Sequence, residues 1–370
     1  MTKITKLSLI AAIAVAGTTA SAQPLAEAIK NVDISGTATY RYNDYEDTNS
    51  TNNYKIAADL KSKVTDDVTF NSRIIMGKNE GTGVASLNTS TVGDSNLNVQ
   101  LSEANFTYTG VKNASVTVGK QGVATAFTVA RDSMGDESTG TGILATYTFA
   151  PVTFAAAYFN QTNITTPYLG GVDLDGTDLA VVAVMGSFGP ISADAWYLDA
   201  DDLADAYTVG LSANFDLGPV ALNPSIRYSD MDVDNYSLDI STFKAEIAAS
   251  MGMFNAYVGY GESGDDGAVA IDGNSSDTVV DPHWRVGLID QADADIIYAG
   301  IGAQVTEKIN VSLKHTNLDN TTGVADQKET YVQVVYDHAA NLSTFVRFGE
   351  YKVEGDEGAT SGRVQVQYTF

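Results

Sequence analysis

One polar segment, residues 124–141, holds the side chains best suited to act on ions. It places Arg131, Asp132, Asp136 and Glu137 within seven positions of one another. Rings of charged side chains decide which ions pass a narrow point of a channel. Aspartates also supply the oxygen ligands that Ca²⁺ prefers. We therefore predict a pore constriction at these four residues and a Ca²⁺ site at Asp132 and Asp136. An ordinary solvated loop tip is the alternative.

Catalytic chemistry has few residues to draw on in this chain. There is no cysteine, and the histidines are His283, His315 and His338. Neither a Gly-x-Ser-x-Gly motif nor a pair of histidines at metal-binding spacing occurs, so the pattern assembles no nucleophile with its base. Two aspartate-rich runs, 173–176 and 230–234, do not match an EF-hand loop. We predict that the protein is not an enzyme and requires no cofactor, with Ca²⁺ as an optional ligand.

The composition restricts the class of protein further. Asp and Glu number 46 against 21 Lys and Arg, which gives a formal net charge of −25. Such acidity argues against a nucleic-acid partner, because nucleic-acid binding depends on basic stripes. The 19 Tyr and 13 Phe residues argue against a disordered acidic chain. After the N-terminal segment there is no run of 18 apolar residues, which excludes a helical membrane protein.

The N-terminal segment 1–22 has the features of a secretory signal peptide. Two lysines precede an apolar run over 7–16, and Ala-Ser-Ala at 20–22 provides the small residues of a cleavage site. The apolar run is too short to span a bilayer as a helix. We expect the mature chain, 23–370, to form a single β-barrel domain.

Beyond residue 31 the chain repeats one pattern: about ten alternating apolar and polar residues, followed by a break. The breaks alternate between short turns such as 189–190 and long polar loops such as 79–96, 124–141 and 263–293. Short turns that alternate with long loops are typical of a transmembrane β-barrel. The pattern predicts an antiparallel barrel of eighteen strands, with sixteen as the alternative. The expected strands are 32–45, 54–64, 68–78, 97–110, 114–123, 142–149, 152–160, 177–188, 191–198, 205–215, 220–229, 236–250, 254–262, 294–305, 309–318, 330–337, 342–353 and 361–370.

The alternation also assigns a face to each side chain. In the last strand Val364, Val366 and Tyr368 share one face, and Arg363 and Gln365 share the other. A cylinder of eighteen strands is too wide for side chains to fill, so the apolar face must contact lipid and the polar face must line a wet lumen. Aromatic residues near strand ends are expected to form interfacial girdles: Tyr40, Tyr42, Tyr108, Tyr158, Phe159, Trp196, Tyr197, Tyr228, Tyr260 and Tyr351.

Basic side chains recur at the positions that the alternation directs into the lumen. We predict that they line one basic wall of the pore, which would set up a transverse field against the acidic loops. The wall consists of Arg41, Lys55, Lys61, Lys63, Arg73, Arg227, Lys244, Arg347 and Arg363. The alternative is that each simply keeps the lumen hydrated. A barrel or secreted β protein that acts as a surface adhesin is the competing function.

Two stretches resemble a known family. Residues 24–42, PLAEAIKNVDISGTATYRY, are similar to the start of the mature major outer membrane protein porins of Campylobacter and related epsilonproteobacteria. Residues 101–142 repeat the TYT, GKQ and GTG landmarks of that family around its third loop, and the closing strand is similar as well. The resemblance implies an eighteen-stranded barrel in the outer membrane that assembles as a homotrimer.

The resemblance also implies a function and partners. It implies passive diffusion of ions and small hydrophilic solutes, with a preference for cations. The resembled family is associated with calcium in its channel, and Asp132 and Asp136 fall where its loop acids lie. The barrel would contact the lipid bilayer and lipopolysaccharide. Phe370, the last residue, looks like the signal that the outer-membrane assembly machinery reads in such barrels.

Overall fold

The computed structural model describes residues 32–46, 48–77, 85–86, 98–164, 176–321 and 323–370. The predicted signal peptide, 1–22, lies outside these ranges. Within the described part of the chain no helix is long and apolar enough to cross a membrane.

The described residues form one antiparallel sheet of twenty strands. Two of these are short: β4 has 2 residues and β12 has 3. The other eighteen contain 9 to 14 residues, enough for a tilted strand to cross a bilayer. In chain order the strands are β1 Val32–Tyr45, β2 Thr51–Lys63, β3 Val68–Gly77, β4 Ala85–Ser86, β5 Asn98–Tyr108, β6 Ala114–Gly122, β7 Thr139–Phe149, β8 Val152–Thr162, β9 Leu179–Phe188, β10 Ile191–Ala200, β11 Ala204–Ala213, β12 Phe215–Leu217, β13 Val220–Val233, β14 Ile240–Met251, β15 Phe254–Ser263, β16 Ala294–Thr306, β17 Ile309–Asn320, β18 Gln327–Ala339, β19 Leu342–Val353 and β20 Ala359–Thr369.

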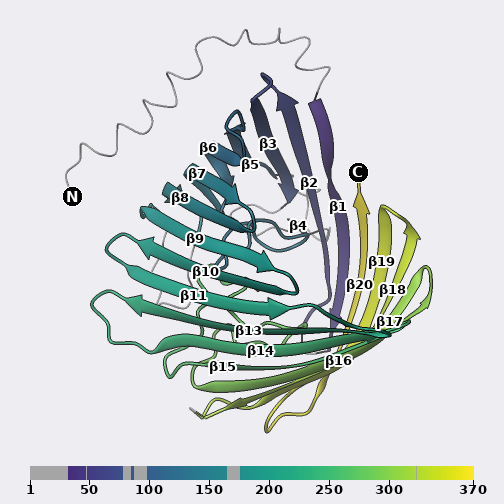
Figure 1. Ribbon diagram of the computed structural model, residues 1–370. Coiled ribbons are helices and arrows are strands. Elements are labelled where there is room, and N and C mark those ends of the chain that lie inside the picture. The colour runs from purple at the N-terminus through teal and green to yellow at the C-terminus, as the bar shows by residue number, and fades with distance from the viewer. Residues whose placement is uncertain (1–31, 47, 78–84, 87–97, 165–175, 322) are drawn as a thin grey trace.

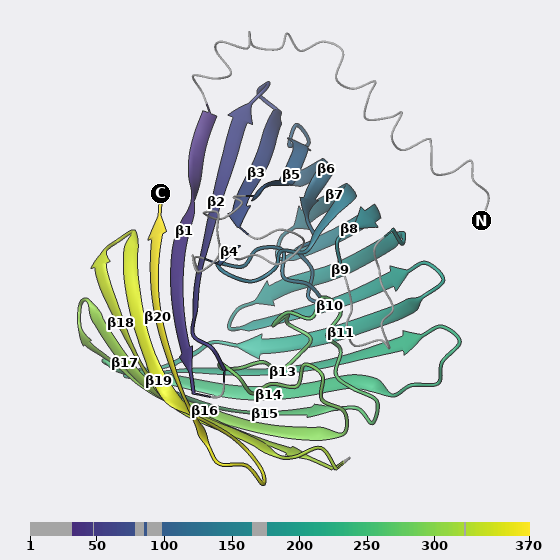
Figure 2. The same ribbon diagram turned by 180° about the vertical axis from the view of Figure 1, so that it is seen from behind.

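The sheet closes on itself between its first and last strands. β1 pairs with β2 on one edge and with β20 on the other, so no strand edge stays open at this seam. Phe370 continues the pairing: its N–H donates to the carbonyl of Gly36 (3.0 Å), and its carbonyl accepts the Gly36 N–H (2.8 Å). Figures 1 and 2 show the ring of strands, with the C-terminal strand beside the first. The predicted eighteen-stranded barrel is confirmed.

Short turns join the strands at one end of the barrel. Gly189 and Gly218 lie in two of these turns with φ of 63° and 78°, a conformation that glycine adopts without strain. Most strand bounds agree with the sequence pattern to within three residues. β14 begins at Ile240, four residues later than predicted, because Tyr236 to Asp239 form an exposed connection.

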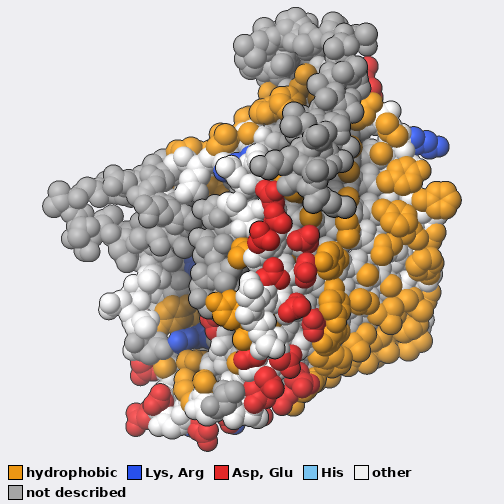
Figure 3. Space-filling model, turned by 90° about the vertical axis from the view of Figure 1, so that its left-hand side faces the viewer, with side chains coloured by type: hydrophobic (Ala, Val, Ile, Leu, Met, Phe, Trp, Pro, Cys, Tyr) orange, Lys and Arg blue, Asp and Glu red, His pale blue; other side chains and the backbone are white. Residues whose placement is uncertain are grey.

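The outer face of the barrel is apolar, as predicted. Val209 and Leu211 on β11, Ile226 on β13 and Ile301 on β16 are all exposed, and they alternate with inward-facing neighbours. Figure 3 shows hydrophobic side chains covering the outer wall, next to a band of acidic side chains. An exposed apolar surface of this extent is stable only against lipid or a protein partner.

The girdle prediction is correct for some aromatic residues and wrong for others. Tyr197 and Tyr228 are exposed on the outer face. Phe159 is buried inside the barrel, and Trp196 packs against the same internal cluster. Tyr351 also faces inward, where the Arg285 guanidinium lies 4.1 Å from its ring centroid. These residues were misassigned because a position near a strand end does not specify which face carries the ring.

Two long loops fold into the barrel from the end opposite the short turns. We call them L3 (residues 123–138) and L7 (residues 264–293). They meet the inner wall of β8 to β14 in an apolar cluster that contains Phe159, Leu198 and Met231 from strands, Phe127 from L3 and Ile271 from L7. This part of the inner wall is therefore apolar, which corrects the prediction of a polar lumen here. The wall is apolar here because loops, and not water, cover it.

Candidate functional site

Two cationic side chains on the inner wall, Lys55 and Arg73, hold L3 in place. Lys55 Nζ on β2 donates to the carbonyls of Asp132 (2.6 Å) and Gly135 (2.9 Å) and to Glu137 Oε1 (2.8 Å). Arg73 on β3 binds both oxygens of Glu137, through Nε (2.8 Å) and Nη2 (2.7 Å). The tip of L3 is thus fixed to neighbouring strands by charge-assisted hydrogen bonds.

Two wall carboxylates complete this network. Asp59 on β2 accepts from Arg73 Nη1 (2.9 Å) and lies 3.3 Å from Arg131 Nη1. Glu103 on β5 accepts from Arg131 Nη2 at 2.8 Å. Arg73 directly faces Asp59 on one side and Glu103 on the other in the strand register. We call these six residues the L3 clamp: Lys55, Asp59, Arg73, Glu103, Arg131 and Glu137.

The centre of the L3 clamp is buried. The side chains of Lys55 and Glu137 are 1% and 3% exposed. Burial by itself would raise the pKa of Glu137, but hydrogen bonds and positive charge from Arg73 and Lys55 outweigh it and lower the pKa below its ordinary value. Glu137 is therefore ionised and neutralised by its partners, so it contributes little net charge to the pore.

The other predicted constriction residues lie in the same turn. Asp132 is exposed, and its Oδ1 accepts the backbone N–H groups of Met134 (2.7 Å) and Gly135. Asp136 is half-buried. The described residues contain no group of three or more His, Asp or Glu side chains that could hold a metal ion. The Ca²⁺ site at Asp132 and Asp136 therefore stays a prediction.

L7 is attached to L3 inside the barrel. Asp272 Oδ2 of L7 accepts the backbone N–H of Val129 (2.5 Å) and the hydroxyl of Ser138 (2.7 Å), both in L3. Thr242 on β14 accepts the Val269 N–H at 2.8 Å, which fixes the start of L7 to the wall. The two loops thus form one internal assembly.

The far end of L7 is docked through His283 and the two residues after it. His283 hydrogen-bonds Tyr257 (2.7 Å) and Thr316 (2.5 Å). Burial, with the nearby charges of Lys314 and Arg347, lowers the pKa of His283 to about 3. Glu329 on β18 accepts the backbone N–H groups of Trp284 (3.0 Å) and Arg285 (3.1 Å). A neutral histidine and a wall carboxylate therefore hold this end.

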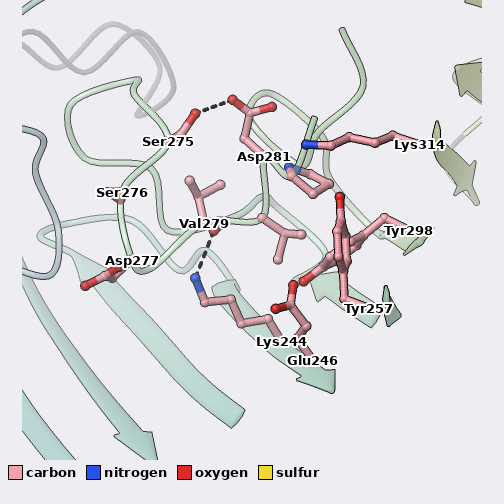
Figure 4. Close-up of a pocket in the computed structure, with 12 residues that line it drawn as sticks. Lys244, Glu246, Tyr257, Ser275, Ser276, Asp277, Val279, Asp281, Tyr298 and Lys314 are labelled. Atoms are coloured by element: carbon pink, nitrogen blue, oxygen red, sulfur yellow. Dashed lines mark hydrogen bonds between the residues drawn. The ribbon is translucent and has the colours of Figure 1, made fainter. Parts of the chain in front are cut away.

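A cavity of about 450 Å³ lies between L7 and the inner wall. Lys244, Glu246 and Tyr298 line it from the strands, and Asp277 and Asp281 line it from L7. Figure 4 shows the wall side chains directed toward the loop, with Lys244 Nζ donating to the carbonyl of Val279 (3.3 Å). The cavity is lined by charged and polar groups of both signs, as suits a hydrated path.

The remaining residues of the predicted basic wall lie in different surroundings. Arg227 forms a two-pronged ion pair with Asp194 on the inner wall, with both N–O distances at 2.9 Å. Lys63 bonds Asp66 in a short turn (3.0 Å), away from the middle of the pore. Lys61 is exposed on β2. The structure thus separates the basic residues into a neutralised set and a set without carboxylate partners.

Three arginines on adjacent strands belong to that second set, together with Lys61 and Lys244. Arg347 on β19 directly faces Arg363 on β20, and Arg41 on β1 faces Gln365, two residues further along β20. All three are half-buried, so each keeps part of its surface in the lumen. We call Arg41, Arg347 and Arg363 the arginine trio.

Several residues that build the site escaped the sequence reasoning. Asp59 could have been predicted: it has the same parity as Lys55 and Lys61 on β2, so the alternation places its side chain in the lumen. Asp272 and Glu329 carried no such signal, because their role depends on a loop folding back on a distant strand.

The geometry defines the class of protein. A closed antiparallel barrel with an apolar outer wall, a charged inner wall and inward-folded loops is an outer-membrane channel of the porin type. Solved structures of this kind are similar to the chain. OpdK of Pseudomonas aeruginosa with vanillate matches with a TM-score of 0.77 and 11% identity, over 92% of this chain and 99% of that chain.

Two further structures show the same fold. OccK3 (OpdO) of P. aeruginosa gives a TM-score of 0.75 at 15% identity, over 94% of this chain and 97% of that one. OccAB4 of Acinetobacter baumannii gives 0.71 at 13%, over 92% and 98%. A search of curated protein sequences finds no match. The family model of the Campylobacter major outer membrane protein matches residues 2–348, and the chain belongs to this family.

Proposed function

We propose that the barrel is a general diffusion porin that passes ions and small hydrophilic solutes across the outer membrane. The observation that carries the proposal is the L3 clamp inside a closed barrel. A loop fixed to the inner wall narrows the bore, and narrowing is what a diffusion channel needs in order to select by size and charge. Buried salt bridges hold that loop against the flow of water and solutes.

We further propose that the channel prefers cations. Its net charge is −25, and Asp199, Asp205 and Asp232 form an acidic rim on the outer face of β10, β11 and β13, at the end from which the loops emerge. Carboxylates around a channel mouth concentrate cations near it. Asp132 adds an exposed carboxylate on L3. Ca²⁺ would join this site through ligands in addition to Asp132 and Asp136.

The proposed assembly is a homotrimer in contact with lipopolysaccharide. The extensive apolar outer wall supports a contact between copies, and family resemblance supports three of them. We also propose that the assembly machinery recognises Phe370, whose side chain is exposed and stacks on Tyr368 with ring centroids 5.9 Å apart. Cross-linking in native membranes tests the trimer: a ladder that ends at the monomer would contradict it.

Planar-bilayer recording tests the channel function. Purified protein should add conductance in discrete steps in KCl, and the reversal potential in a KCl gradient should have the sign of cation preference. Protein that inserts without conductance steps would end the proposal. A reversal potential of anionic sign would leave the channel and refute the cation preference.

A further inference from the structure

The arginine trio concentrates positive charge at one place on the inner wall. Arg347 and Arg363 are directly opposed across two antiparallel strands, where like charges are destabilising. Arg41 lies diagonally from Arg363 on the next strand. Such an arrangement is stable when something other than the strands compensates the repulsion.

The hydrogen-bond partners of the trio are neutral. Arg41 Nε donates to Gln365 Oε1 (2.8 Å), Arg363 Nε to Asn43 Oδ1 (2.6 Å), and Arg347 through Nε and Nη2 to Gln333 Oε1 (2.9 and 2.8 Å). Among the described residues no carboxylate oxygen lies within 4.0 Å of these guanidinium nitrogens. Every cation of the L3 clamp has such an oxygen. The trio therefore offers donors to an anion.

An aromatic platform lies beneath the guanidinium groups. Trp284 of L7 has Arg347 at 5.0 Å and Arg363 at 5.1 Å from its ring centroid. Arg347 also lies 4.6 Å from the ring centroid of Tyr331. Stacking on rings holds guanidinium planes in a fixed orientation while leaving their N–H edges available.

The same platform contains two further donors. Trp284 Nε1 and Tyr331 Oη are buried, and within the described part of the chain neither has a hydrogen-bond partner. The carboxylate of Glu329 is engaged by backbone N–H groups of L7. Donors thus exceed acceptors here, and an unpaired buried donor costs free energy.

We propose that the arginine trio binds the carboxylate of a small organic anion as it crosses the lumen. Two guanidinium groups on neighbouring strands match the two oxygens of a carboxylate, which arginine binds in a bidentate fashion. The neutral amide oxygens of Gln333, Gln365 and Asn43 hold the guanidinium N–H groups less tightly than a carboxylate would. A solute can therefore displace them, and its binding is reversible. This inference rests on the proposed function, since it supplies a class of solute for that channel.

Titration calorimetry of the full-length protein in detergent, with sodium benzoate as the probe, tests the site. Wild-type protein should bind benzoate, and the double variant Arg347→Gln/Arg363→Gln should bind about tenfold or more weakly, because it loses two charge-assisted hydrogen bonds. Arg347→Lys, which keeps the charge without the planar fork, should fall between them. The control Lys61→Gln removes one lumen charge outside the trio and should change the affinity less than about twofold.

Each contrary result overturns the inference. Equal benzoate affinity in the wild type and the double variant would show that the trio is not a binding site. A loss of affinity in Lys61→Gln as large as that in the double variant would show that binding reflects only the general charge of the lumen. Tighter binding of inorganic phosphate than of benzoate refutes the carboxylate class. A shift in gel mobility on heating verifies that each variant forms the barrel. KCl conductance is recorded in parallel: a conducting protein that ignores benzoate refutes the site alone, and a benzoate-binding protein without conductance refutes only the proposed channel.

Discussion

Two regions of the same inner wall use basic side chains in opposite ways. In the L3 clamp, Lys55 and Arg73 are buried and joined to carboxylates at 2.7 to 2.9 Å. In the arginine trio, Arg347 and Arg363 stay half-buried, bond neutral amides and lie over Trp284. All of them occupy inward-facing positions on strands in which apolar and polar residues alternate. The role of a lumen cation is therefore set by the loop that reaches it.

The partner that each loop supplies explains the difference. L3 brings Glu137, an anion, to the wall and becomes fixed there. L7 brings Trp284, an aromatic ring, which orients the guanidinium groups without neutralising them. One region loses its net charge and becomes structural, and the other keeps its charge available to solutes.

The largest expected effect follows from Glu137→Gln in the L3 clamp. The change leaves Lys55 and Arg73 with buried charges that have lost their shared partner. Breaking a buried ion pair costs about 3–5 kcal/mol, so L3 should detach from the wall. Hydrogen exchange measured by mass spectrometry should show lost protection over residues 123–138. The control Glu307→Gln, in an exposed short turn, should leave that protection intact. Unchanged exchange in Glu137→Gln would mean that the clamp does not hold the loop.

A smaller effect is expected when the link between the two loops is cut. Asp272→Asn removes the charge that accepts hydrogen bonds from Val129 and Ser138. Hydrogen bonds to a charged group contribute about 1.5–3 kcal/mol, so L3 and L7 should both become more susceptible to limited proteolysis. Cleavage confined to L7 would show that L3 is held by its clamp alone.

The sequence predicted the barrel well and the inside of the barrel poorly. Strand length and alternation are local properties, so the seam at Phe370 and the outward face of Val209 follow from them. The role of Glu137 does not, because an acidic loop residue has the same local signature whether it faces water or Lys55. Only the fold decides which strand a loop meets.

Acidification should loosen L7 at His283. The docked loop holds His283 neutral with a pKa of about 3, against 6.5 for a free histidine. Between these values the undocked loop takes up a proton and the docked loop does not, so docking is fully favoured above pH 6.5 and weakens as the pH falls toward 3. At pH 4.5 the loss for this partly buried group should be about 1–2 kcal/mol.

The fluorescence of Trp284, compared at pH 7.5 and 4.5, reports this change. Asp281 acts in the other direction, since burial raises its pKa and its protonation favours the docked loop. The variant His283→Gln isolates the histidine, because it retains Asp281 and cannot take up the proton. A pH response of equal size in wild type and His283→Gln would assign the effect to another group.

The smallest expected effect separates the two regions by ion selectivity. Arg363→Gln removes a charge that faces the lumen, so the cation-to-anion permeability ratio should rise by roughly twofold. Asp132→Asn should lower the ratio by a similar factor, since this carboxylate is exposed on L3. Reversal potentials in a KCl gradient measure both changes. Lys55→Gln provides the contrast: Lys55 is buried and holds L3, so its loss should alter current noise through a loosened L3 more than it alters the sign of selectivity. A shift for Lys55→Gln as large as that for Arg363→Gln would show that the clamp contributes to the field of the pore, and the distinction between the two regions would fail.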